Sequence, residues 1–342
     1  MSVDGERPIV GISVGDPAGI GPEVCARALA LPRIHGIARA LVLGDLGLMR
    51  EAVRLCGLGL EVRAAASPAA GSYREGVIDV LQTGGVDLRE LRRGVVSPLA
   101  GKASFECVRA VIELALAGRI HATVTGPINK EAINAAGFHY AGHTEIYGAL
   151  TGSRDYAMML VDGEFRVVHV STHCSLREAC ERARTPRVLT VIELAHRALL
   201  RLGIDRPRIA VAGLNPHAGE AGLFGREEIE EIAPAVREAA SRGIGASGPY
   251  PADTLFSKLA GGLYDIVVAM YHDQGHIPAK LRSFRYDSAS DGWLSMSGVN
   301  VTLGLPIVRT SVDHGTAFDR AWKGTANPDS MVQAIEMAVR LA

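Results

Sequence analysis

The chain has 342 residues, of which 48% are apolar and 21% charged, and its net charge at pH 7 is −1. This length allows two domains or one large α/β unit, while the balanced charge argues against a general nucleic-acid or membrane-surface role. No apolar run approaches the length of a membrane span. The five cysteines lack CxxC or zinc-finger spacing and fit reduced thiols better than a disulfide framework. With a short polar N-terminus and no signal peptide, the sequence predicts a soluble, cytoplasmic protein.

Apolar strands and amphipathic helices are predicted to alternate along the chain. A long helix is predicted at 104–120, with a strand directly after it, and further helices at 186–202 and 226–241. The other strands are predicted at 8–15, 38–45, 165–173, 208–220, 265–275 and 306–315. Near-continuous apolar strands alternating with helices are typical of a mostly parallel sheet covered on both faces. The predicted fold class is therefore α/β.

The first predicted strand ends in "GDPAGIGPEV" (15–24), a glycine-rich turn before a helix. Its glycines could let backbone N–H groups approach a phosphate at the helix start. The spacing matches neither G-x-G-x-x-G nor G-x-x-x-x-G-K-S/T, the two familiar nucleotide fingerprints. A tight strand-to-helix turn without a ligand explains the segment equally well.

Histidines follow several of the predicted strands. They are His173, His217, His272 with His276, and His314. In open parallel sheets, ligands bind outside the carboxyl ends of the strands, so the first three could converge on one divalent metal ion. Each of them alone could instead be a loop histidine bonded to backbone. Asp253 is a possible carboxylate contribution or an ordinary helix-capping aspartate.

Two further segments carry candidate anion-binding residues. In "TGPINKEAINAAGFHYAGHTEIYG" (125–148), His143 and Thr144 could donate to an oxyanion, although a helix start with ordinary capping is the alternative. In the segment 299–330, Asn300 and Arg309 lie around a predicted apolar strand. An arginine there is a natural fork for phosphate or carboxylate, and the glycine-rich turns after Asp313 could line a nucleotide.

Taken together and in order, such motifs resemble the 4-hydroxythreonine-4-phosphate dehydrogenase family from about residue 9 to the C-terminus. The matching segments are "GDPAGIGPE", "TGPINK", "GHTE", "STHCSLRE", "LNPHAGE", "PADTLF", "MYHDQGHIPAK", "GVNVTLGLPIVRTSVDHGTA" and "KGTANP". The resemblance implies two α/β/α domains with the active-site cleft between them, as in isocitrate and isopropylmalate dehydrogenases. The first domain would comprise 1–125 plus 299–342, and the central domain 126–298.

The resemblance also implies roles for individual residues. The divalent metal ion (zinc, magnesium, manganese or cobalt) would be bound by His173, His217 and His272. The substrate would be bound by His143, Thr144, Lys280, Asn300 and Arg309. The NAD cofactor would be bound by Asn215, Gly219, Asp313, Gly315 and Thr316. Asp253 would approach the active site from the neighbouring subunit of a homodimer, whose active site is shared across the interface.

One departure from the family pattern concerns the substrate. The segment 281–299, "LRSFRYDSASDGWLSMSGV", is longer than its equivalent in the vitamin B6 pathway enzymes. With "HIPAK" before it, this segment resembles the branch of the family that acts on D-threonate or D-erythronate 4-phosphate. We therefore expect a small phosphorylated hydroxy acid as substrate, with no nucleic-acid or membrane partner.

The implied chemistry is an NAD-linked oxidation of the C3 hydroxyl to a 3-oxo acid, followed by loss of carbon dioxide. Lys280 is the first candidate for the base or proton relay, and Asp253 is the second. We expect His276 at most to contact the metal ligands, without binding the metal ion itself. Three alternatives stay open. They are 4-hydroxy-L-threonine 4-phosphate as substrate, a cis-dihydrodiol carboxylate as substrate, and a metal-dependent hydrolase.

Overall fold

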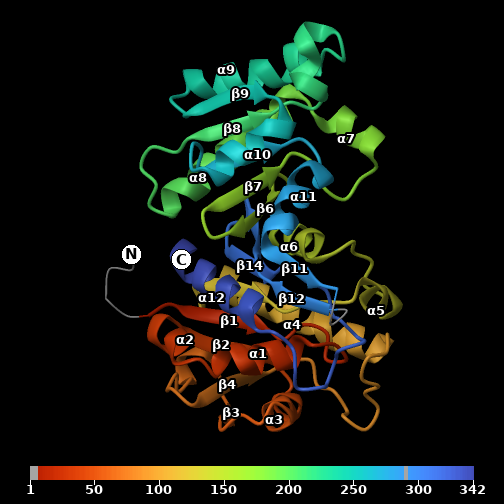
Figure 1. Cartoon of the computed structure of the whole chain (residues 1–342). Helices are drawn as coiled ribbons and strands as arrows, with labels where there is room; N and C mark the ends of the chain where they lie inside the picture. The colour runs from red at the N-terminus through yellow and green to blue at the C-terminus, as the bar shows by residue number, and fades with distance from the viewer. Residues whose placement is uncertain (1–6, 289–291) are drawn as a thin grey trace. The chain divides into compact units, whose positions relative to one another are not determined.

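The computed structural model of the protein describes residues 7–288 and 292–342 (Figure 1). The chain divides into two compact units, which we call unit 1 (the chain up to Ser153, with Leu305–Ala342) and unit 2 (Arg154–Gly304). Residues 289–291 of the predicted substrate-specifying segment 281–299 lie outside the described residues. The domain boundaries expected from the resemblance stay a prediction.

Unit 1 contains six parallel strands in the order β3-β4-β2-β1-β5-β14. Their bounds are Ile9–Ser13 (β1), Arg39–Gly44 (β2), Glu61–Ala64 (β3), Val77–Gln82 (β4), Ala122–Thr125 (β5) and Val308–Val312 (β14). β1 is buried at every position. Because both faces of the strand are covered, its sequence shows an apolar run instead of an alternation.

The helices of unit 1 pack on this sheet. They are α1 (Gly21–Leu29), α2 (Pro32–Ile37), α3 (Leu46–Leu55), α4 (Pro98–Leu116), α5 (Lys130–Ala135), α6 (His143–Thr151) and α12 (Asp329–Leu341), with a 3-10 turn at Pro68–Ala70. α4 begins six residues before its predicted start. The hydroxyl of Ser97 accepts a hydrogen bond from the N–H of Ala100 (3.2 Å) and Pro98 fits the first turn, so the chain carries its own start signal there.

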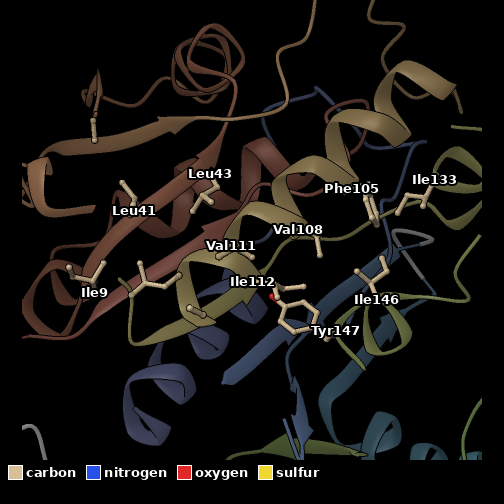
Figure 2. Close-up of a cluster of buried hydrophobic side chains, with 13 residues drawn as sticks. Ile9, Leu41, Leu43, Phe105, Val108, Val111, Ile112, Ile133, Ile146 and Tyr147 are labelled. Carbon is tan, nitrogen blue, oxygen red and sulfur yellow. The ribbon is translucent and has the colours of Figure 1, made fainter. Parts of the chain in front are cut away.

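A large apolar core joins α4 to the sheet of unit 1 (Figure 2). Val108, Val111 and Ile112 of α4 lie over Leu41 and Leu43 of β2. Farther along α4, Phe105 stacks on Phe138 with ring centroids 3.8 Å apart. Ile146 and Tyr147 add α6 to the same core, and both are fully buried. This packing fixes α6, which carries two of the predicted substrate-binding residues.

Unit 2 contains a mixed sheet in the order β13-β6-β7-β10-β8-β9. The bounds are Ala157–Asp162 (β6), Phe165–His169 (β7), Ile209–Ala212 (β8), Ala246–Tyr250 (β9), Ile266–Ala269 (β10) and Val299–Leu303 (β13). β7, β10, β8 and β9 run parallel, whereas β6 is antiparallel to both β7 and β13. A separate antiparallel hairpin pairs β11 (Phe284–Asp287) with β12 (Gly292–Met296).

The helices of unit 2 are α7 (Leu176–Arg182), α8 (Thr185–Arg201), α9 (Ala233–Ser241), α10 (Ala252–Ala260) and α11 (His272–Ser283). A 3-10 segment lies at Pro216–Gly222 and a π-helix at Glu228–Ile232. Leu255 and Leu259 of α10 and Ala279 of α11 pack on Val167 and Val267 of the central strands. The strand ends of this unit are therefore anchored to a rigid, buried core.

The predicted α/β fold class is confirmed, while two local predictions are wrong. β8 ends at Ala212, so the strand predicted at 208–220 is too long. The strand predicted at 265–275 is also too long, because β10 ends at Ala269 and residues 272–283 form helix α11. Pro278 inside this segment removes one helical hydrogen bond and crowds the carbonyl four residues earlier, a cost that tertiary packing can outweigh. In the described ranges, no helix is both long and apolar enough to cross a membrane.

Candidate active site

The three predicted metal ligands follow three neighbouring strands of unit 2. β7, β10 and β8 are adjacent and parallel, so the segments after them leave the sheet at the same edge. β7 ends four residues before His173, β10 three before His272, and β8 five before His217. Gln274 ties two of these strand ends together, because its side chain accepts from the N–H of Met270 and donates to the carbonyl of Gly213, both at 2.7 Å.

His272 is the first residue of α11 and is held in one tautomer. Its Nδ1 lies 2.6 Å from the Oδ1 atom of Asp273. Because a carboxylate accepts hydrogen bonds, Nδ1 carries the hydrogen and Nε2 keeps its lone pair for a ligand. The ring of His173 lies 6.2 Å from that of His272, centroid to centroid.

Two further histidines form a buried pair beside His272. Nδ1 of His169 donates to the carbonyl of Met158 (3.1 Å), so its Nε2 accepts from Nδ1 of His276 (3.1 Å). The ring of His276 stacks on that of His272, with centroids 3.6 Å apart and planes inclined by 10°. Burial lowers the pKa of His169 to about 4 and that of His276 to about 2. Both rings are therefore neutral near pH 7.

Sequence reasoning missed His169. The available signal was a histidine at the last position of a buried strand, in "RVVHVSTH", four residues before a predicted ligand. A polar ring at such a position needs a buried partner, but the pattern does not say which residue supplies it. In the structure that partner is His276. The placement of His276 behind the metal ligands stays a prediction.

His217 lies in a turn with an unusual backbone. From His217 to Ala221, φ is 53°, 53°, 80°, 44° and 53°, which is left-handed throughout. Gly219 adopts this conformation without penalty, whereas each of the other four residues pays roughly 1–2 kcal/mol. Such strain persists only where surrounding contacts over-determine the conformation. Asn215, just before the turn, donates from Nδ2 to the carboxylates of Glu227 (2.7 Å) and Glu228 (3.0 Å).

The other predicted residues of unit 2 lie on three different elements. Lys280 is half-buried on α11, two turns after His272, and its Nζ lies 4.2 Å from the ring centroid of Phe284. Asp253 is exposed in the first turn of α10. Asn300 is half-buried on β13, opposite Leu160 of β6. The catalytic and substrate-binding roles of these residues stay predictions.

In unit 1, Arg309 is a buried cation on strand β14. Only 2% of its surface is exposed, and its Nη2 donates to the hydroxyl of Thr125 (3.0 Å). Its guanidinium lies 5.4 Å from the ring centroid of Tyr147, whose hydroxyl donates to Thr123 (3.0 Å). Burial lowers the pKa of Arg309 to about 10, so the side chain is still charged at neutral pH.

His143 and Thr144 begin helix α6 in the same unit. Thr144 is buried, and so is the Nε2 atom of His143, which has no hydrogen-bond partner within the described ranges. Burial, together with the charges of Arg309 and Lys130, holds the pKa of His143 well below its usual range. A neutral imidazole and the N–H groups of a helix start suit an anion, and the nearby arginine strengthens that preference.

The predicted NAD-binding residues of unit 1 follow β14. The N–H of Asp313 donates to the hydroxyl of Ser330 (3.1 Å). The carbonyl of Thr316 accepts from the N–H of Ile20 (3.0 Å), which joins this turn to "GDPAGIGPEV". A Cβ atom added to Gly315 would meet open space. The two glycine-rich segments singled out in the sequence therefore meet in unit 1.

The donor set of unit 2 suits a divalent metal ion. Imidazole nitrogens are common ligands of zinc and other transition-metal ions, and the tautomer of His272 leaves Nε2 available. Across the described part of the chain, however, no three or more His, Cys, Asp or Glu side chains are grouped closely enough to hold a metal. His217, on the left-handed turn, would have to supply the third ligand beside His173 and His272, so the metal site stays a prediction.

Comparison with known proteins identifies the relatives of the chain. The family model described as "Pyridoxal phosphate biosynthetic protein PdxA" matches residues 36–338. A D-threonate 4-phosphate dehydrogenase of Pectobacterium atrosepticum is 47% identical over 98% of this chain and 99% of its own. A 4-hydroxythreonine-4-phosphate dehydrogenase of Desulforapulum autotrophicum is 46% identical over 97% of this chain and 95% of its own.

A solved structure resembles the chain over the same extent. It is that of a putative 4-hydroxythreonine-4-phosphate dehydrogenase from Salmonella typhimurium, with a TM-score of 0.87 and 46% identity. The match covers 98% of this chain and 100% of that one. The resemblance seen in the sequence motifs is thereby confirmed.

Proposed function

We propose that this chain, which belongs to the family of the pyridoxal phosphate biosynthetic protein PdxA, is a dehydrogenase of a 4-phosphorylated C4 hydroxy acid. Its substrate would be D-threonate or D-erythronate 4-phosphate, and it would depend on NAD and a divalent metal ion. The observation that carries the proposal is the placement of three histidines after three adjacent parallel strands. The relative named D-threonate 4-phosphate dehydrogenase supports the choice of substrate.

Each predicted residue has a task in this reaction. When bound, the metal ion would acidify the substrate hydroxyl and NAD would accept hydride from C3. His173, His217 and His272 would hold the ion, and Asp273 would keep the lone pair of Nε2 on His272 directed to it.

Lys280 is the residue to which we assign proton transfer. As a neutral amine, its Nζ would receive the proton of the C3 hydroxyl, and the resulting ammonium would later stabilise the enolate that remains when carbon dioxide leaves. The half-buried position two turns after His272 supports this assignment. Asp253, exposed on α10, would contribute from the neighbouring subunit of a homodimer.

The phosphate would be bound mainly by unit 1. Arg309 supplies a buried positive charge, and His143 and Thr144 stand at the start of α6. A helix N-terminus and a guanidinium both prefer a dianion. Asn300 would complete the substrate contacts. The segments around Asn215, Gly219, Asp313, Gly315 and Thr316 would bind NAD, and the whole reaction would take place in the cytoplasm.

A second candidate substrate is 4-hydroxy-L-threonine 4-phosphate. The observation that favours it is the 4-hydroxythreonine-4-phosphate dehydrogenase among the relatives. Its identity to this chain is 46%, close to the 47% of the D-threonate enzyme. The two acids differ at C2, where one carries a hydroxyl and the other an ammonium group. A cis-dihydrodiol carboxylate has no phosphate and would leave the anion-binding residues of unit 1 with only a carboxylate to bind.

The test is NAD reduction by the purified protein, followed at 340 nm with each of three 4-phosphorylated acids. These are D-threonate, D-erythronate and 4-hydroxy-L-threonine, each with and without a chelator. We expect turnover of a sugar acid that the chelator abolishes and added metal restores. Turnover of hydroxythreonine phosphate alone would move the protein to the second candidate. A metal-dependent hydrolase would release phosphate without reducing NAD.

A further inference from the structure

Glu228 is a buried carboxylate that takes no part in the reaction proposed above. It begins the π-helix Glu228–Ile232, and only 3% of its surface is exposed. Within the described ranges it forms no ion pair. Its hydrogen bonds come instead from the loop that follows β8. Burying a carboxylate is costly unless it is well hydrogen-bonded, so Glu228 depends on these hydrogen bonds to stay buried.

The hydrogen bonds of Glu228 fix the backbone that leads to His217. Oε1 accepts from the N–H of Leu214 (2.8 Å) and from the N–H of Asn215 (2.7 Å). Oε2 accepts from the carboxamide of Asn215 (3.0 Å). Two successive backbone N–H groups directed at one anion form a rigid concave site. The direction in which the chain leaves β8 is therefore set by this carboxylate.

Two glycines leave room for the carboxylate on either side of His217. A Cβ atom on Gly213 would lie 3.2 Å from Oε1 of Glu228, and one on Gly219 would lie 2.7 Å from Oε2. The carboxylate thus touches the start of the loop and the centre of the left-handed turn. A strained turn needs such contacts to persist.

We propose that Glu228 is a positioning residue, which holds the left-handed turn 217–221 in the conformation that presents His217 to the metal ion. This inference rests on the metal dependence of the proposed function. It does not depend on which phosphorylated acid is oxidised. Glu228 itself would touch neither the ion nor the substrate. Residues that orient metal ligands in this way typically change metal affinity 10- to 100-fold when replaced.

The chain offers a matched control three residues away. Glu231 lies on the same π-helix, and its carboxylate accepts from the N–H (2.7 Å) and hydroxyl (2.9 Å) of Thr185 and from Arg184 (2.9 Å). These bonds anchor the start of α8 and do not involve the loop after β8. Glu231→Gln should therefore lower stability without changing metal binding.

The experiment is a calorimetric titration of the metal-free protein with Mn²⁺, for wild type, E228Q, E228D, E228A and E231Q. We expect Mn²⁺ affinity to fall about 10-fold in E228Q, whose amide oxygen can still accept from the backbone, and about 100-fold in E228A. E231Q should bind Mn²⁺ like wild type. Hydrogen exchange of the amides of Leu214 and Asn215 should quicken in the Glu228 variants alone, which gives a readout that is independent of activity.

Two results would overturn the inference. One is a folded E228Q or E228D that binds Mn²⁺ with wild-type affinity. The other is an equal loss of affinity in E228Q and E231Q, because the effect would then be general destabilisation. A wild-type protein that binds Mn²⁺ but reduces no NAD with any of the three acids would sink the proposed dehydrogenase function, and the comparison of variants would still decide the role of Glu228.

Discussion

Replacing the buried Arg309 by methionine (R309M) should cost activity without costing stability. Burial lowers the pKa of this guanidinium from 12.5 to about 10. Because its native pKa lies below its ordinary one, the charged form is disfavoured in the folded protein at neutral pH, by about 3 kcal/mol. Methionine removes that cost and also loses the bond to Thr125 and the contact with Tyr147, worth about 1 kcal/mol each.

The net expectation for R309M is a free energy of unfolding that is unchanged or raised by about 1 kcal/mol. The same change removes the charge-assisted hydrogen bonds expected with the phosphate. These are worth about 1.5–3 kcal/mol, so kcat/KM should fall about 10- to 100-fold, mainly through KM.

The control is R166M. Arg166 is also buried, but its guanidinium donates to the carbonyls of Glu164 (3.4 Å) and Asp265 (3.2 Å) and to the carboxylate of Glu164 (2.5 Å). Removing it should lower the free energy of unfolding by about 2–3 kcal/mol, because these acceptors lose their charged donor, while kcat/KM stays the same. Differential scanning calorimetry and NAD reduction measure the two quantities. A loss of stability in R309M as large as that in R166M would refute the reasoning.

Three other changes test separate contacts. H169L and H276L should each destabilise the protein, and the double variant should cost less than their sum by about 0.5–3 kcal/mol, because the two rings are hydrogen-bonded to each other; strict additivity in urea unfolding would contradict this. Asp16 is buried and its pKa is raised to about 6, so the native state binds its proton more tightly than the unfolded chain and wild-type stability should fall as pH rises from about 4 to about 6. D16N should therefore be more stable than wild type at pH 8, by up to about 3 kcal/mol, and the gain should vanish near pH 4; a gain that does not vary with pH would point to another cause. G275A should lower the melting temperature through a loss of about 1–3 kcal/mol, because its Cβ would lie 2.4 Å from Nε2 of His169; an unchanged melting temperature would mean that the His169 ring can move aside.

The local sequence indicated several of the parallel strands, some of the helices and the positions at which polar residues follow strands. Buried parallel strands are short apolar runs, and their ends are marked by glycine, proline and polar residues. For this reason His173, His217 and His272 could be singled out before their strands were known to be neighbours. The order of the motifs also determined the family, since shared residues at matching positions need no knowledge of the fold.

Only the tertiary structure decided which residues support that site. The partners in the His169–His276 pair are 107 positions apart, and Glu228 lies after the loop that it holds. Sequence periodicity reports which side chains face a core, because it depends on neighbours three or four residues away in a helix and two in a strand. It does not report which buried polar groups satisfy one another. The left-handed turn at His217 was hidden for the same reason, because four of its five residues ordinarily avoid that conformation and only contacts from elsewhere in the chain keep them there.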